Sequence, residues 1–321
     1  MGRIVLDYVL VLKLLLISQT MGVRPGQPIV HLCLAVSLRS TGIRPVGVVE
    51  MRRHIFANIV FKVTGPEATV ECQDDQLCVG LRVEINGTIH GVQAVWYKNS
   101  TTEEWGFLLI DANITFNEFN LVVMLWTVRH LWLSGAHFAF NCYCSWSSLV
   151  LQNGNGTASI LHSREGVTQE YPIEMIVYMI GILPLINNLK QETPDVTHPW
   201  YADNSGASGT FARLKTYFDL LTRKIIGQGY HPDLTKSILI VRQENLETGK
   251  VFGARHRFRV CTGARYLGGY IGDDNSKRDW MRECTQTWEK NISTISKTAD
   301  KYTQESYAAV VHEIQLKLIF L

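Results

Sequence analysis

Two aspartates carry the clearest chemical signal in the sequence. Asp111 ends the apolar run 105–110, and Asp203 lies in the short segment Trp200–Gly206. If the strands that bear them are neighbours, their carboxylates converge and repel one another unless a cation neutralises them. Oxygen ligands of this kind suit Mg²⁺ or Mn²⁺. Paired metal ions held by aspartates are the usual arrangement for in-line phosphoryl transfer.

Each aspartate also has a purely structural interpretation. An Asp at the end of a strand is commonly a helix N-cap or a turn former. Asp203 followed by Asn204 is typical of a hairpin tip. Two other acidic pairs, Asp74-Asp75 and Asp273-Asp274, lie in polar surroundings and are interpreted as solvated turns. Only convergence on adjoining strands would make the first two aspartates a site.

The segments around these aspartates mix helices and strands. The continuous apolar run 105–110 predicts a buried strand, and 174–189 predicts a buried helix. Further helices are predicted over 117–132, 138–151, 211–226 and 279–302, and further strands over 238–241 and 258–271. Because there is no regular β-α-β rhythm and no glycine-rich nucleotide fingerprint after a strand, we expect an α+β fold.

The N-terminal part of the chain is interrupted by proline and glycine. Residues 22–47 are expected to be rich in loops. A helix is predicted over 51–63 and is expected to stop at Gly65-Pro66. Over 76–96 apolar and polar residues alternate around Asn86-Gly87, which predicts a hairpin, with a helix as the alternative.

Composition limits the class of protein without naming a partner. The chain has 321 residues, of which 46% are hydrophobic and 19% charged, so it can bury a large core. Its 31 Lys and Arg nearly balance 29 Asp and Glu, so any basic surface for nucleic acid must be local. The seven cysteines are scattered and lack zinc-ligand spacing, which indicates reduced thiols in an intracellular protein.

The first 30 residues are apolar and otherwise unassigned. The stretch 4–17 is similar to a signal peptide or anchor, but Asp7 and Lys13 interrupt it and no cleavage motif follows. We interpret it as a buried helix and expect no stable membrane association and a location in the cytoplasm or nucleus. The alternative, a secreted or membrane-anchored glycoprotein, rests on this stretch and on N-x-S/T triplets at Asn86, Asn99, Asn113, Asn155 and Asn291.

Several short segments, taken in chain order, resemble the sequence motifs of reverse transcriptases. They are Arg44–Val48 (the R-P-I segment of the fingers), Asp111–Phe116 (motif A), Gly166–Pro172 (motif B), Tyr201–Asn204 (motif C), Gly229–Lys236 (motif D) and Arg265–Gly269 (motif E). The set is similar to that of retrotransposons, of the kind without long terminal repeats. The resemblance identifies a truncated and partly degenerate reverse transcriptase domain.

This resemblance implies a right-hand polymerase architecture in which an antiparallel palm sheet packs on helices. The fingers-like region is expected over 31–104, and the palm, with an interleaved fingers segment, over 105–275. Residues 276–321 are expected to begin a thumb or a connecting helix, so the thumb is incomplete or absent. The implied partners are an RNA template, a DNA primer and deoxynucleoside triphosphates.

The resemblance also implies a role for individual residues. Asp111 and Asp203 would hold two Mg²⁺ or Mn²⁺ ions, with the Ala112 carbonyl and Asn204 as further ligands. Lys236 would protonate or shield the pyrophosphate leaving group. The remaining implied contacts are Phe116, which would exclude a 2′-hydroxyl, Gln169 and Arg44 at the nucleotide, and Leu267-Gly268 as the grip on the primer.

Three positions depart from the family pattern. Asn204 stands where motif C usually has a second Asp, Glu170 replaces a glycine of motif B, and Tyr171 replaces a residue that is usually small or acidic. An amide brings no negative charge to a cation, and a Glu adds bulk and charge beside a triphosphate. The alternative function is therefore a catalytically dead remnant that keeps the palm fold and binds nucleic acid weakly.

Overall fold

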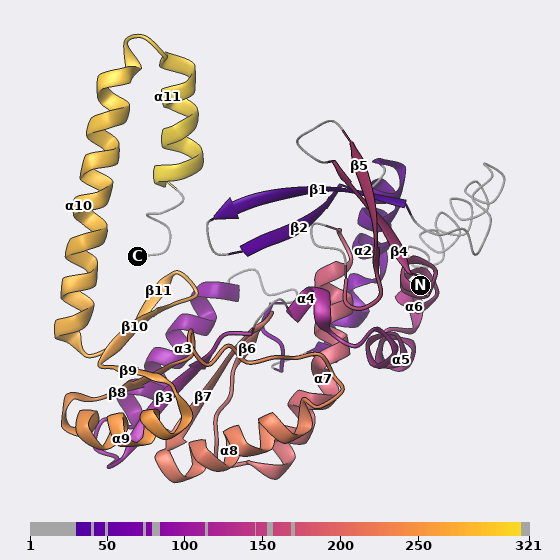
Figure 1. Cartoon of the computed structure of the whole chain (residues 1–321). Coiled ribbons are helices and arrows are strands. Elements are labelled where there is room, and N and C mark those ends of the chain that lie inside the picture. Colours follow the sequence, from indigo (N-terminus) through magenta and orange to yellow (C-terminus); the bar gives the residue numbers. More distant parts are fainter. Residues whose placement is uncertain are drawn as a thin grey trace, which may run out of the picture.

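The structure is a computed structural model of the chain (Figure 1). It describes residues 30–39, 42–48, 51–72, 75–78, 84–112, 115–144, 146–152, 157–167 and 171–315. The predicted helix in the first 29 residues, Gln169, Glu170 and the side chain of Arg44 lie outside the described part.

A five-stranded sheet positions both aspartates. Its order is β6 (Trp200–Tyr201), β7 (Asn204–Thr210), β3 (Trp105–Ile110), β8 (Ile238–Val241) and β9 (Arg259–Cys261). β3 pairs antiparallel with β7 and with β8, and only β8 and β9 pair in parallel within this sheet. Every residue of β3 is buried, which confirms the strand predicted from its apolar run.

The two faces of β3 pack into different cores because side chains alternate along a strand. Leu108 and Ile110 belong to the larger core, which includes residues of α7 (Glu174–Glu192) and α8 (Phe211–Lys224). Phe107 and Leu109 belong to a smaller core. That core also holds residues of α3 (Glu84–Lys98) and of the hairpin β10 (Gly263–Tyr266) and β11 (Gly269–Gly272).

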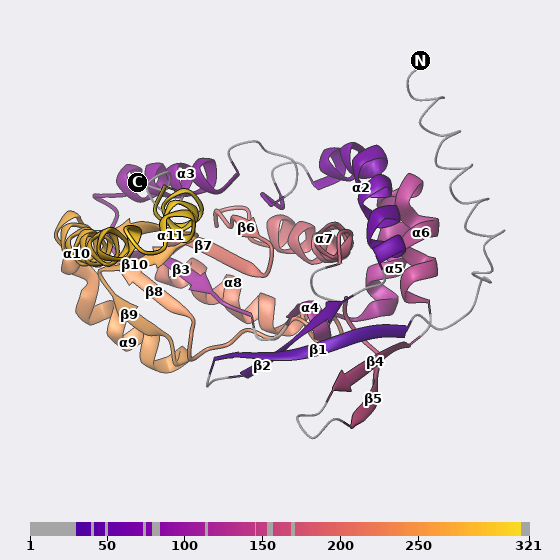
Figure 2. The same ribbon diagram turned by 90° about the horizontal axis from the view of Figure 1, so that it is seen from above.

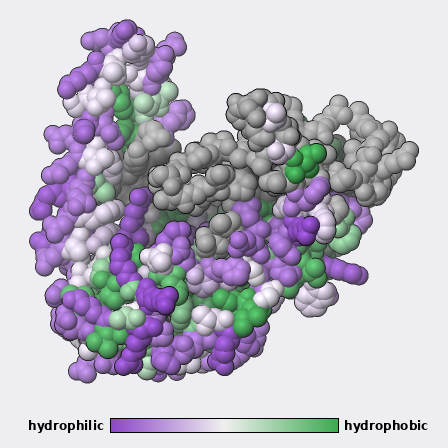
Figure 3. Space-filling view, in the orientation of Figure 1, coloured by the Kyte–Doolittle hydropathy of each residue, from purple (hydrophilic) through white to green (hydrophobic). Residues whose placement is uncertain are grey.

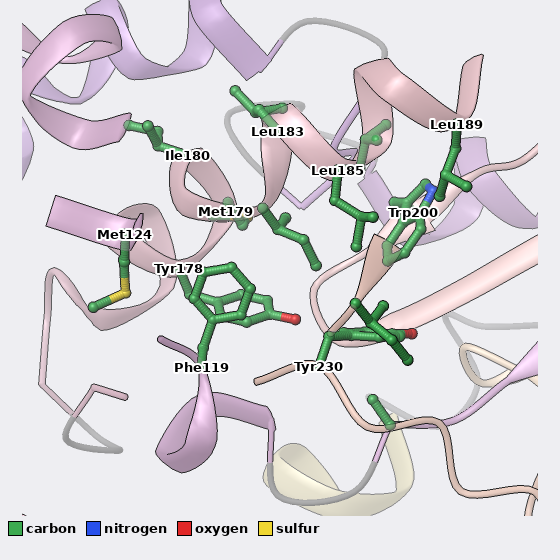
Figure 4. Close-up of a cluster of buried hydrophobic side chains, with 14 of the residues drawn as sticks. Phe119, Met124, Tyr178, Met179, Ile180, Leu183, Leu185, Leu189, Trp200 and Tyr230 are labelled. Carbon is green, nitrogen blue, oxygen red and sulfur yellow. The ribbon is translucent and has the colours of Figure 1, made fainter. Parts of the chain in front are cut away.

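Helix α7 forms the centre of the larger core and confirms the buried helix predicted over 174–189. Its Tyr178 ring lies 5.4 Å from that of Phe119, and the rings of Trp200 and Tyr230 are 5.5 Å apart. Figure 4 shows these four aromatic side chains in the same buried cluster, around Leu185 and Met179. The interior beneath the candidate site is therefore densely aromatic.

A second sheet lies apart from the first in Figure 1 and has the order β2 (Gly42–Val48), β1 (Val30–Arg39), β4 (Ser147–Gln152) and β5 (Ala158–Ser163). β1 pairs with β4 in parallel, and its other neighbour is antiparallel. The prediction of loops over 22–47 was wrong for the described residues. The helix predicted over 138–151 was wrong from residue 147 onwards, because pairing with β1 and β5 holds that segment as a strand.

The predicted end of the first helix at Gly65-Pro66 was also wrong. α2 runs from Met51 to Cys72 and contains Pro66. Its buried positions Ala57, Thr64 and Ala68 continue on one side of the helix past the proline. Pro66 itself is exposed, so the backbone hydrogen bond that proline removes is lost on the side that faces water.

The hairpin predicted at Asn86-Gly87 was wrong, and the alternative of a helix is confirmed. Both residues lie near the start of α3, whose buried residues Ile89, Val92 and Trp96 follow helical spacing. The helix predicted over 117–132 is divided between α4 (Thr115–Glu118) and α5 (Leu121–Leu131). α6 (Leu133–Tyr143) follows α5 directly.

The predicted helical tail is confirmed as α10 (Asp274–Ala299), which is followed by α11 (Thr303–Ala309) and a π-helical turn, Val310–Ile314. These helices stand beside the β10–β11 hairpin and away from α7 in Figures 1 and 2. No residue of α10 is buried, and its surface is mainly hydrophilic (Figure 3). Among the described residues, no helix has both the length and the apolarity that crossing a membrane requires.

Candidate active site

The two aspartates lie at the same end of the five-stranded sheet. Ile110 of β3 pairs with Ser205 of β7, so Asp111 follows the last paired residue of one strand and Asn204 precedes its counterpart on the next. Tyr201 pairs with Asn204 across the β6–β7 hairpin, which leaves Ala202 and Asp203 as the two turn residues. The strands that bear Asp111 and Asp203 are therefore direct neighbours.

Tyr230 belongs to the larger core and lies near both aspartates. Its hydroxyl is 3.1 Å from Ser205 Oγ and donates to the carbonyl oxygen of Asp203 at 3.4 Å. Burial raises the pKa of Tyr230, and the charges of Asp203 and Asp111 raise it further against the lowering effect of the Ser205 hydrogen bond. Tyr230 was not predicted as a site residue, because an isolated tyrosine in a glycine-rich loop carries no local signal.

A second loop brings the ammonium group of Lys236 close to Asp111. Lys236 Nζ lies 3.8 Å from Asp111 Oδ2 and 3.1 Å from Asp233 Oδ2. The backbone N–H of Asp233 donates to the carbonyl oxygen of Asp111 at 2.7 Å, and Ala112 forms an isolated bridge with Pro232. The hydrogen bond from Thr235, together with Lys236, lowers the pKa of Asp233 and keeps that carboxylate charged beside the lysine.

The donor set of the site is small. Asn204 Nδ2 donates to Asp203 Oδ1 at 3.2 Å, so the amide is turned toward its neighbouring carboxylate. The described residues contain no group of three or more His, Cys, Asp or Glu that could hold a metal ion. Two carboxylates and an amide oxygen fit a Mg²⁺ ion that arrives with substrate phosphates, because Mg²⁺ in such sites keeps only one or two carboxylate ligands.

Two glycines hold α4 beside the site. Gly166 has a φ of 68°, and a Cβ there would lie 2.2 Å from the carbonyl oxygen of Phe116. Gly229 has a φ of 76°, and a Cβ there would lie 1.9 Å from the carbonyl oxygen of Glu118. Both loops also hydrogen-bond this region: Val167 N–H donates to Phe116, and the Asn120 N–H donates to Gln228.

The aromatic residues of motifs A and B both contact the larger core. The Phe116 ring lies 4.6 Å from that of Tyr178 and is partly buried against the larger core. Tyr171 is buried, with its hydroxyl 3.5 Å from Cys142 Sγ. The tyrosine that departs from the family pattern at this position therefore packs in the core. The two residues before it, Gln169 and Glu170, are outside the described part.

Leu267 and Gly268 form the two-residue turn between β10 and β11. Their φ values are 48° and 90°, as a type I′ hairpin turn requires at both positions. The hairpin packs against the sheet through the rings of Tyr266 and Phe107, which are 6.0 Å apart. Burial raises the pKa of Tyr266, and the nearby Tyr201 adds to that rise.

Two acidic residues predicted to be solvated have structural partners. Asp75 forms an ion pair with Lys190 of α7. Asp273 is the N-cap residue of α10, accepts a hydrogen bond from the Gln243 N–H at 3.2 Å and lies 3.9 Å from Arg242. The interpretation of these residues as solvated turns was wrong, because each carboxylate faces a group far away in the sequence.

Comparison with known proteins gives a likeness in three dimensions only. No protein-family model and no curated protein matches the sequence. Apo telomerase from Candida tropicalis superposes with a TM-score of 0.56 at 11% identity, over 77% of this chain and 48% of that one. Telomerase from Candida albicans, in complex with the TWJ fragment of telomeric RNA, gives 0.57 at 9% identity, over 77% and 46%.

The chain has a reverse-transcriptase-like fold. A Candida tropicalis telomerase truncated from its C-terminal domain is also similar, with a TM-score of 0.57 at 11% identity over 78% of this chain and 55% of that one. The chain thus spans about half the length of these telomerases. At such low sequence identities the similarity is one of fold alone.

Proposed function

We propose that this chain is the RNA-directed DNA polymerase domain of a retrotransposon, acting by two-metal nucleotidyl transfer to a primer 3′-hydroxyl. One observation carries the proposal. Asp111 and Asp203, far apart in the sequence, follow and precede directly neighbouring strands, with Lys236 beside the first of them. The fold shared with telomerase, an RNA-directed DNA polymerase, and the order of the motifs along the chain support the same function.

Asp111 and Asp203 are the residues proposed to hold Mg²⁺ or Mn²⁺, with the Asn204 amide oxygen and the Ala112 carbonyl as further ligands. Bound ions would lower the pKa of the primer hydroxyl and neutralise the triphosphate. Lys236 is more than half exposed, so it can leave Asp111 and reach the pyrophosphate leaving group. Its positive charge would stabilise the charge that develops there.

The remaining site residues are proposed to select and hold the substrates. Phe116 would contact the sugar of the incoming deoxynucleotide, and Gln169 and Arg44 its base or phosphates. Leu267 and Gly268 would contact the primer, because Tyr266, which precedes them, lies near Tyr201 of the hairpin that carries Asp203. In this proposal 31–104 act as fingers, 105–275 as the palm and 276–321 as the start of a thumb. The template would be RNA held mainly through its backbone, in the cytoplasm or nucleus.

A second candidate function is a catalytically silent remnant that binds nucleic acid weakly. The observation that favours it is Asn204, which donates to Asp203 where the family pattern has a further carboxylate. At an effective dielectric constant near 20, one missing unit charge at close range weakens cation binding by at most about 4 kcal/mol. The site then depends more strongly on the substrate to bring its ions.

A primer-extension assay separates the two candidates. On poly(rA)/oligo(dT), with Mg²⁺ or Mn²⁺, we expect the chain to incorporate dTTP, and Asp111→Ala and Asp203→Ala to abolish incorporation. Asp219→Asn is the matched control, because Asp219 is a partly exposed residue of α8 that pairs only with Lys215 among the ion pairs described. Incorporation no greater than that of Asp111→Ala would refute the polymerase and leave the remnant.

A further inference from the structure

Gln76 is fully buried and makes a pair of hydrogen bonds with one residue of the candidate site. Its Nε2 donates to the carbonyl oxygen of Ala202 at 3.2 Å, and its Oε1 accepts from the N–H of Ala202 at 2.8 Å. An amide side chain is one of the few groups that can satisfy a backbone donor and a backbone acceptor together. Both polar groups of Ala202 are thus satisfied by a residue far away in the sequence.

Ala202 needs this support because of its backbone conformation. Its φ is 53°, in the left-handed region that side chains rarely adopt, whereas Asp203 is not among the residues with positive φ. A positive φ at only the first of two turn residues is the type II′ pattern, which favours glycine at that position. An alanine there is strained, and the Gln76 hydrogen bonds offset the strain.

The segment that carries Gln76 is itself attached to the same hairpin and to the core. The N–H of Leu77 donates to the carbonyl oxygen of Trp200 at 2.9 Å, so this segment contacts β6 as well as the turn. Asp75 pairs with Lys190 of α7. Gln76 therefore approaches the turn from a segment that is held in place by the contacts of Asp75 and Leu77.

We propose that Gln76 is a positioning residue for Asp203: it fixes the strained turn residue that immediately precedes this carboxylate. The inference rests on the proposed function, because it assumes that Asp203 binds a divalent cation. Without Gln76 the turn samples other conformations, and Asp203 spends less time directed toward the cation that it shares with Asp111. Gln76 does not itself contact substrate or metal in this scheme.

Gln76→Met tests the proposal, because methionine has a similar volume and no group that can pair with Ala202. Gln286→Met on the exposed surface of α10 is the matched control. Two measurements are made on each full chain: hydrogen–deuterium exchange of the peptide 200–206, and binding of Mn²⁺ alone, followed by the paramagnetic resonance of the free ion. Gln76→Met is expected to speed exchange and weaken Mn²⁺ binding at least about tenfold each, and the control to change neither.

Ala202→Gly provides a second variant, since glycine removes the strain that Gln76 offsets. Combined with Gln76→Met, it should recover part of the lost Mn²⁺ affinity and restore folding if the single variant folds poorly. Faster exchange with unchanged Mn²⁺ affinity would overturn the positioning role and leave only a structural one. A wild-type chain that binds Mn²⁺ through Asp203 but incorporates no nucleotide would refute the polymerase while leaving this inference standing.

Discussion

Two glycines two residues apart allow the packing of α4 on the 227–229 loop to be measured. Gly227 and Gly229 have nearly the same backbone conformation, with φ of 81° and 76°. A Cβ at Gly227 meets nothing within 4 Å, whereas a Cβ at Gly229 lies 1.9 Å from the carbonyl oxygen of Glu118 and 2.7 Å from Phe119 Cα. Gly227→Ala and Gly229→Ala therefore both introduce backbone strain, and only Gly229→Ala also introduces a steric clash.

The shared cost is left-handed backbone strain of about 1–2 kcal/mol for any residue with a Cβ. Both substitutions also restrict the unfolded chain to the same extent, so that effect cancels between them. Gly229→Ala adds a clash with backbone atoms, which cannot rotate away, and overpacking of this kind costs about 1–3 kcal/mol. We expect Gly229→Ala to lower the free energy of unfolding by that additional amount.

Urea unfolding of the two variants, followed by tryptophan fluorescence, measures the difference. The same displacement should move the loop that leads to Asp233 and Lys236, so dTTP incorporation should fall in Gly229→Ala and stay near the wild-type level in Gly227→Ala. Equal losses of stability in the two variants would show that α4 does not pack on this loop, and would refute the way in which Lys236 is brought to Asp111.

Three further outcomes are expected. The pKa of buried His198 is lowered to about 4 from 6.5, mainly by burial. Because the unfolded state takes up the proton first as the pH falls, the free energy of unfolding should decrease by about 3 kcal/mol from pH 6.5 to pH 4. Urea titrations of His198→Gln should lack this loss. Asn204→Asp should lower the melting temperature in EDTA, where it repels Asp203, and tighten Mg²⁺ binding at least about tenfold in calorimetry. Tyr230→Phe leaves the buried Ser205 hydroxyl without its tyrosine partner and should cost about 1–3 kcal/mol in urea unfolding.

The elements that the sequence predicts well are those whose burial is uniform along the chain. β3 is apolar on both faces because cores lie on both sides of it, so its composition alone identifies a buried strand. The same holds for α7, which is buried on most of its surface. The aspartate that follows β3 could be singled out because it ends such a run.

The mispredicted elements are those in which tertiary contacts override a local signal. Gly65-Pro66 would end an isolated helix, but α2 continues because residues before and after the proline are buried in the core. The Trp132 indole N–H also donates to the Thr64 carbonyl oxygen at 3.0 Å. Ser147–Val150 has no periodicity of its own that identifies a strand, and its state is set by pairing with β1 and β5.

The candidate site likewise contains some residues that the sequence predicts and others that it does not. Asp111 and Asp203 could be named from motif spacing, whereas their strand pairing is a long-range property that the sequence leaves open. Gln76 and Tyr230 could not be found, because each acts through a hydrogen bond to backbone or side chain across the fold. Gln76 belongs to no motif, and Tyr230 lies in the motif D segment 229–236, for which the resemblance implies a role only for Lys236. Supporting residues of this kind become visible only when the fold is known.

The most direct test of the central claim is a crystal structure of the chain with template-primer, dTTP and Mn²⁺, measured at a wavelength where manganese scatters anomalously. We expect anomalous density between Asp111 and Asp203, at coordination distance from an oxygen of each carboxylate. Density elsewhere on the protein, or none at these two residues while dTTP is bound, would contradict the claim that they form a shared metal site.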